Sequence, residues 1–157
     1  MNQQELSLIA KTILDSNMYM VLGTADDIGQ PWVSPVYFAC AEYREFYWIS
    51  SPEVRHSRNI SARPEISIVV FDSQAPVGTG QAVYMSAVAK QLTTVELDRG
   101  LEIYNGRFSD PAKHGVRVIE SKDVQEPALY RLYRATASEY WVLDPDRRTD
   151  HRTPVSM

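Results

Sequence analysis

Residues 46–71 read FYWISSPEVRHSRNISARPEISIVVF, and this stretch decides the fold. Its two ends, residues 46–49 and 66–71, are short, apolar and rich in aromatic and β-branched side chains, which is typical of buried strands. Between them, Ser-Pro-Glu at residues 51–53 has the signature of a helix start, because Ser caps, Pro suits the first helical position and Glu complements the dipole. The residue before Pro64 avoids helical angles, so the helix should stop there.

Four more extended segments are predicted outside this stretch, at residues 18–24, 32–40, 82–92 and 129–143. Asn2 and Glu5 have the spacing of a capping box and predict an N-terminal helix over residues 1–16. Thr93 and Glu96 predict a second capped helix after the fifth strand. Regular crossover helices are missing, so the pattern indicates a mainly β (α+β) fold, a six-stranded antiparallel Greek-key barrel with peripheral helices.

The composition narrows the class of protein. A chain of 157 residues that is 44% apolar and 23% charged predicts a single domain over residues 1–157, with a polar tail at 144–157. The net charge of −4, without a long basic block, argues against nucleic-acid binding. Cys40 stands alone, which favours a reducing compartment, and no apolar run approaches the ~20 residues of a membrane span. We therefore expect a cytoplasmic protein without membrane contact.

Several common catalytic motifs are missing. Residues 78–80 read Gly-Thr-Gly, but a dinucleotide loop would need a third glycine where Val83 stands, and this loop precedes a strand instead of a helix. No serine lies in a Gly-x-Ser-x-Gly elbow. The three histidines, at positions 56, 114 and 151, share no metal-type spacing, so no metal site is predicted.

Residues 50–59 gather polar and basic side chains at a strand end and a helix start. Backbone N–H groups, the hydroxyls of Ser50 and Ser51 and the guanidinium of Arg55 can face one small volume there, as a phosphate monoester requires. Each charge-assisted hydrogen bond contributes about 1.5–3 kcal/mol, so two or three supply much of the ~8 kcal/mol of a micromolar affinity. A solvated basic helix face is the alternative interpretation.

The same region resembles a known family pattern, in which an aromatic strand ending in Thr or Ser is followed by Arg-Lys, Asn-Leu and Asn-Pro pairs. The matching segments here are Trp48-Ile49-Ser50-Ser51, Arg55-His56, Asn59-Ile60 and Arg63-Pro64. Residues 81–87 are similar to the family's Gln-Val-Arg-Val-Glu-Gly strand, and residues 139–141 to its Glu-Phe-Trp. The pattern is that of the FMN-binding split barrels related to pyridoxamine 5′-phosphate oxidase, and the resemblance spans most of residues 29–141.

This resemblance implies a split-barrel fold and a homodimer that holds FMN at the subunit interface. The cofactor-binding residues that it implies are Ser34, Pro35, Val36, Ser50, Ser51, Arg55, His56, Gln81 and Trp141. The pair at 55–56 would face the FMN phosphate, and the serines at 50–51 the phosphate or the ribityl chain. Residues 34–36 would bring strand backbone against the isoalloxazine ring. Gln81 and Trp141 would contact the cofactor from the other subunit of the dimer. Pro35 cannot donate to a sheet ladder, which predicts an edge strand.

The chain also departs from the family pattern. His56 stands where the family usually has Lys, so phosphate binding is expected to depend on pH. Val33 and Phe38 replace an Arg and a Lys of the oxidase. The Arg-x-His motif that grips pyridoxal phosphate is not clearly present; its possible counterparts, differently spaced, are Arg147, Arg148, His151 and Arg152.

We expect an FMN-dependent oxidoreductase that acts on an unidentified small molecule, with a nicotinamide or another small reductant. The sequence predicts no catalytic residue. A noncatalytic flavin-binding or sensing module is one alternative, and a relative that uses a deazaflavin or haem is the other.

Overall fold

The computed structural model describes residues 1–143 and 151–157. Its elements in chain order are α1 (Gln3–Ser16), β1 (Tyr19–Ala25), β2 (Pro31–Tyr37), β3 (Ala39–Ala41), β4 (Glu45–Ser50), α2 (Arg55–Ala62), β5 (Glu65–Phe71), β6 (Ala82–Gln91), α3 (Thr94–Asn105), two 3₁₀ turns (Pro111–His114 and Ser121–Asp123), β7 (Arg131–Leu143) and β8 (Arg152–Pro154). Among the described residues, no helix combines the length and the apolar character needed to cross a membrane.

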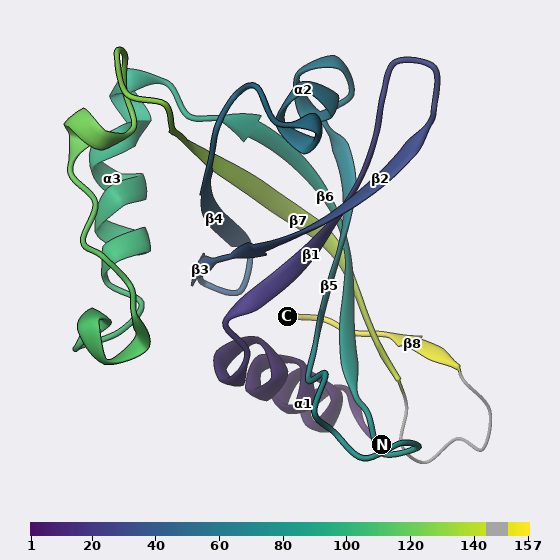
Figure 1. The fold of residues 1–157 in the computed structure, drawn as a ribbon. Coiled ribbons are helices and arrows are strands. Elements are labelled where there is room, and N and C mark those ends of the chain that lie inside the picture. Colours follow the sequence, from purple (N-terminus) through teal and green to yellow (C-terminus); the bar gives the residue numbers. More distant parts are fainter. Residues whose placement is uncertain (144–150) are drawn as a thin grey trace.

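The described strands form one antiparallel sheet in the order β2-β1-β5-β6-β7-β4-β3, with β8 paired to β7. The sheet coils so far that β2 comes into contact with β4, although these two strands are not paired (Figure 1). We call this line between β2 and β4 the seam. The arrangement confirms the predicted mainly β split barrel, and β2 is the edge strand that Pro35 predicted.

The described residues form eight strands, so the predicted number of six was too low. The first addition is β3, which forms because the predicted run at residues 32–40 is interrupted at Phe38 and then pairs with β4 instead of β1. The second is β8, in which Arg152–Pro154 extends the sheet beside Trp141–Leu143. Part of the predicted polar tail is therefore ordered against the barrel, and Val155 behind it is buried.

Two helices cover the ends of the barrel (Figure 1). Asn2 caps α1, its side chain accepting from Glu5 N while the Glu5 carboxylate accepts from Asn2 N, which confirms the predicted capping box. At the other end, α2 begins at Arg55, three residues later than its sequence signature suggested. The Ser51 hydroxyl accepts instead from Glu53 N at 3.1 Å, in a turn that precedes the helix.

The third helix, α3, packs on the outside of the barrel and buries a second apolar cluster against β4 and β7. Its members are Ala39, Tyr47, Leu92, Leu97, Leu101, Tyr104, Val124 and Leu132. Gly100 allows this close packing, since a Cβ there would stand 2.6 Å from a Leu92 methyl and 2.9 Å from a Leu132 methyl. The described part of the chain thus has one core inside the barrel and one beneath α3.

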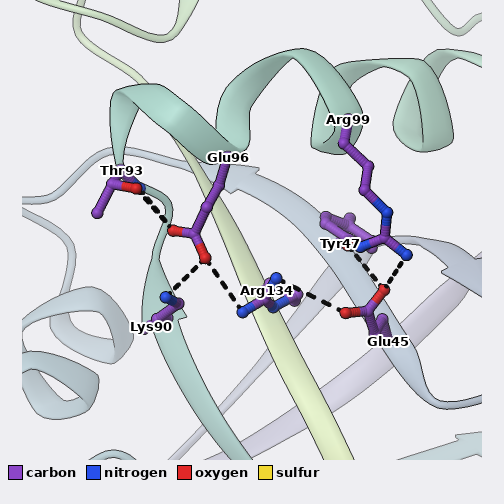
Figure 2. Close-up of polar contacts among 7 residues, drawn as sticks. All are labelled: Glu45, Tyr47, Lys90, Thr93, Glu96, Arg99 and Arg134. Carbon is purple, nitrogen blue, oxygen red and sulfur yellow. Dashed lines mark hydrogen bonds and ion pairs between the residues drawn. The ribbon is translucent and has the colours of Figure 1, made fainter.

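A network of charged side chains ties α3 to the sheet (Figure 2). The Glu96 carboxylate accepts from Thr93 N at 3.0 Å, and it pairs with Lys90 of β6 at 2.7 Å and Arg134 of β7 at 3.3 Å. Arg134 also approaches Glu45 of β4 at 3.6 Å. Hydrogen bonds from Lys90 and the Thr93 backbone lower the pKa of Glu96 to about 2.

We expect Glu96→Gln to lower the free energy of unfolding at pH 7 by about 1 kcal/mol, because it weakens a helix cap and two ion pairs. Since the pKa of Glu96 is lowered on folding, its contribution is complete above about pH 4.5 and lost as the pH falls toward 2. Thermal unfolding from pH 7 to 3 should show the gap between wild type and variant closing. Glu102→Gln, on the same helix but without an ion pair among the described residues, is the control. A constant gap would contradict the assignment.

Candidate functional site

The candidate site lies at the seam, where three elements bring polar side chains together. His56, on α2, is 9% exposed and places its ring between the two strands. Its Nδ1 lies 3.2 Å from Ser34 Oγ on β2, and its Nε2 lies 2.8 Å from Ser50 Oγ on β4. These two contacts link strands that have no backbone pairing across the described seam. The structure therefore brings together three of the residues predicted to bind the cofactor.

Arg55 lies beside this cluster and is held by an aromatic ring. Its guanidinium carbon is 4.5 Å from the centre of the Trp32 ring, a cation–π contact. The Trp32 indole donates through Nε1 to Ser34 Oγ at 3.0 Å. Trp32 was missed by the sequence analysis, although its position two residues before Ser34 on one strand places both on the same face.

The charge state of His56 controls what the two serines can offer. Burial lowers the pKa of His56, so its imidazole is neutral at pH 7. A neutral ring has one N–H, so it donates to one serine and accepts the hydroxyl proton of the other. Only one of the two hydroxyls then keeps its proton for a ligand. Protonation of the ring would free the second hydroxyl and add a positive charge.

Asn59 fixes the position of α2 over the seam. It is buried, and its Nδ2 donates to Thr24 Oγ1 on β1 at 3.0 Å. The Thr24 hydroxyl in turn donates to the Trp32 carbonyl at 3.3 Å. Since His56 and Asn59 are three residues apart on the helix, both face the β1–β2 side of the barrel. The predicted Asn-Ile pair thus positions the helix that carries Arg55.

A groove crosses the outer face of the sheet, and the seam serines, Arg55 and His56 are not among its lining residues. Its first part, about 580 Å³, runs over β1, β2, β5 and β6 and includes Trp32. Its second part, about 370 Å³, ends at Trp141 and Arg152. The two parts share Gly23, Val33, Ser67 and Ser86 in their walls, so they are continuous. Gly23 keeps the floor low, because a Cβ there would come within 2.4 Å of Ser67 Oγ.

The other predicted cofactor residues are distributed along the barrel. Ser51 lies in the turn before α2, and Pro35 and Val36 lie on β2. Trp141 lies at the far end of the groove, where the Arg152 guanidinium stacks 3.9 Å above the centre of the Tyr84 ring. Gln81 precedes β6, and its buried Oε1 has no hydrogen-bond partner among the described residues. Arg147 and Arg148 lie outside the described residues.

These surroundings fit a flavin mononucleotide. The Arg55 guanidinium and the serine hydroxyls at the seam match a phosphate, because charge-assisted hydrogen bonds are strongest to such an anion. A long, mainly apolar floor between Trp32 and Trp141 matches a planar ring system. Each part of the groove has the volume of a typical small-molecule site, about 300–1,000 Å³. The donor set and the shape therefore agree.

Comparison with known proteins gives one family. The model of the family described as pyridoxamine 5′-phosphate oxidase matches residues 9–144, which is most of the chain. No curated protein sequence matches.

Solved structures with the same fold include a haem-binding protein from Mycobacterium smegmatis, with a TM-score of 0.67, 18% identity and coverage of 92% of this chain and 55% of that one. The haem storage protein from Vibrio cholerae has a TM-score of 0.65 and 19% identity, and the match covers 85% of this chain and 90% of that one. A FAD-binding protein from Mesorhizobium loti has a TM-score of 0.60 and 20% identity, and the match covers 87% of this chain and 92% of that one. The chain spans about half of the Mycobacterium smegmatis protein.

Proposed function

Since the chain belongs to the pyridoxamine 5′-phosphate oxidase family, we propose that it is an FMN-binding flavoprotein that acts as an FMN-dependent oxidoreductase on a small molecule. The observation that carries this proposal is the set of donors at the seam, where Arg55 and the two serines can bind a phosphate. The groove on the outer face of the sheet offers an apolar floor for a ring. The FAD-binding protein of the same fold supports a flavin as the ligand.

Each part of the site has a separate role in this proposal. Arg55 binds the FMN phosphate. One of the two seam serines donates its hydroxyl proton to the phosphate while the His56 ring is neutral, and both do so once the ring is protonated. The floor of the groove orients the isoalloxazine ring and excludes water from one of its faces. Bound FMN supplies the hydride and electron transfer chemistry, and the protein supplies orientation and hydrogen bonds. A nicotinamide is the reductant that we propose.

We propose that a second copy of the chain covers the groove and completes the site. The outer face of the sheet carries exposed apolar side chains, with Val33 67% exposed, Val88 55% and Phe71 45%. Exposed apolar side chains that gather on one face of a sheet are typical of a surface that another protein covers. Gln81 and Trp141 of the second copy would then contact the ring, as the resemblance to the family implies. Light scattering on the FMN-bound protein tests this: we expect a dimer, and a strict monomer at micromolar concentration would overturn the shared site.

The proposed activity is tested by adding FMN to the purified protein, removing free flavin and recording the absorption spectrum. We expect a flavin spectrum with one FMN per chain, and bleaching by NADH or NADPH without oxygen. A haem or deazaflavin spectrum in the protein as purified would show that the protein binds that cofactor instead of FMN. A stable flavin spectrum that no small reductant bleaches would make the protein a flavin-binding module instead of an enzyme.

FMN affinity should fall as the pH rises from about 6.5 to 9, a range above the second phosphate pKa near 6. The reason is that a bound dianion favours the protonated His56 ring, which raises a pKa that burial lowers in the free protein. His56→Lys keeps the positive charge and should flatten the profile. Flavin fluorescence measures both proteins, with riboflavin as the control that lacks a phosphate. Parallel profiles for the two proteins would rule out the phosphate role of His56.

A further inference from the structure

The hydrogen bond from Trp32 constrains the hydroxyl group of Ser34. An indole N–H can only donate, so its bond of 3.0 Å occupies one lone pair of Ser34 Oγ. The same oxygen lies 3.2 Å from His56 Nδ1. Ser34 Oγ can therefore accept a second hydrogen bond from His56 and keep its own proton free, or it can donate that proton to His56.

The two tautomers of the neutral ring differ in which serine keeps a free proton. With the ring proton on Nδ1, His56 donates to Ser34 and accepts from Ser50, whose Oγ lies 2.8 Å from Nε2. The free proton then belongs to Ser34, which is half-buried on the edge strand β2. With the ring proton on Nε2, the free proton belongs to Ser50, which is 8% exposed and whose hydroxyl makes no other hydrogen bond among the described residues.

Burial decides between these two tautomers. A hydroxyl proton without an acceptor costs free energy where water is excluded, and it costs little where water can reach it. The Nδ1–H tautomer leaves no such proton in the interior, because Ser50 then donates to Nε2. It also places two N–H donors on Ser34 Oγ, which polarise that hydroxyl and make it a better donor to an anion.

Trp32 connects Ser34 to the arginine of the site. The Arg55 guanidinium carbon lies 4.5 Å from the centre of the Trp32 ring, and the N–H of this ring binds Ser34. The Trp32 backbone is fixed as well, since its carbonyl accepts from Thr24, which Asn59 of α2 holds in place. One indole therefore contacts both the charged group from α2 and the hydroxyl from β2.

We propose that Ser34 is the hydroxyl that donates to the FMN phosphate while His56 is neutral, and that Trp32 is the positioning residue that aims it. Ser50 has a different role, because it holds His56 in the tautomer that leaves the Ser34 proton free. The proposal rests on the flavin site proposed above, and it specifies which of the two serines binds the phosphate.

The first test needs no ligand. Long-range ¹H–¹⁵N correlation spectra distinguish a protonated ring nitrogen from a bare one, and they are recorded at about pH 8 because burial lowers the pKa of His56. The signals that are missing from His56→Gln protein belong to this ring. We expect a protonated Nδ1 and a bare Nε2. A protonated Nε2 would overturn the proposal, because Ser34 would then give its proton to the ring.

The second test compares the matched variants Ser34→Ala and Ser50→Ala by flavin fluorescence at the same pH, where the phosphate is a dianion. Ser34→Ala should weaken FMN binding about tenfold or more, the loss of one hydrogen bond to a charged group. Its riboflavin affinity should change less than about twofold, which also shows that the ring site is intact. Ser50→Ala should weaken FMN binding less than Ser34→Ala does, and the reverse order would contradict the assignment.

Trp32→Phe tests the positioning role, since it keeps an aromatic face for Arg55 but removes the N–H that binds Ser34. It should weaken FMN binding about two- to tenfold in wild type, the range of a neutral hydrogen bond. In Ser34→Ala protein it should have almost no effect, because the indole acts through that hydroxyl. Equal losses in the two backgrounds would refute this role. Failure of the flavin site itself would look different, because wild type would then bind neither FMN nor riboflavin.

Discussion

Arg55→Ala is expected to weaken FMN binding by about 10- to 150-fold, which corresponds to the 1.5–3 kcal/mol of a hydrogen bond to a charged group. The guanidinium is held 4.5 Å from the centre of the Trp32 ring, so little side-chain freedom is lost when a phosphate binds. Riboflavin has the same ring but no phosphate. Its affinity should change less than about twofold, since that interaction is missing for it. Flavin fluorescence quenching measures both ligands.

The matched control for this experiment is Arg58→Ala. Arg58 carries the same charge on the same helix but lines a separate pocket, together with the end of β6. FMN affinity should therefore be nearly unchanged in this variant, which separates a local phosphate contact from a general effect of net charge. Equal losses for FMN and riboflavin in Arg55→Ala would show that Arg55 acts on the ring or on the fold instead of the phosphate.

Trp48→Ala should cause the largest loss of stability, about 3–5 kcal/mol, because it removes a large side chain from the barrel core. Trp48 is 0% exposed, and its ring stacks on Tyr133 with centres 5.6 Å apart. This loss is a large fraction of the 5–15 kcal/mol that stabilises a typical domain. At about 2–4 °C per kcal/mol, the melting temperature should fall by roughly 6–20 °C. Differential scanning calorimetry measures it.

Trp48→Phe provides a graded comparison. It keeps an aromatic ring opposite Tyr133 and removes an indole N–H that has no hydrogen-bond partner among the described residues. The loss of stability in Trp48→Phe should therefore be less than half of the loss in Trp48→Ala. Trp32→Ala, at a position 41% exposed, should lower stability far less than Trp48→Ala. A Trp48→Ala protein that melts within a few degrees of wild type would show that this part of the core repacks.

The sequence predicted those parts of the fold that depend on neighbouring residues. The capping boxes at Asn2 and Thr93 placed two helices correctly, because each box is complete within four residues. The start of α2 was wrong, since Ser51 has a competing local use in a turn. No local signal marks β8, because its pairing depends on the free side of β7 and on the burial of Val155.

The candidate site was predictable to a similar degree. Ser50, Arg55 and His56 lie within seven residues, so local spacing was enough to place them together. Ser34 is distant in sequence, and only the coiling of the sheet brings it to His56. Trp32 and the groove toward Trp141 depend on the register of five strands, which no single segment of sequence specifies.

The side-chain closure of the barrel at β2 and β4 has a consequence for motion. Separating two paired strands requires breaking a ladder of backbone hydrogen bonds, whereas here the links include two contacts of one imidazole. The β1–β2 hairpin is thus the part of the barrel whose outer strand can detach at the lowest free energy. Amide hydrogens of β2 that face the seam should exchange fastest among the long strands.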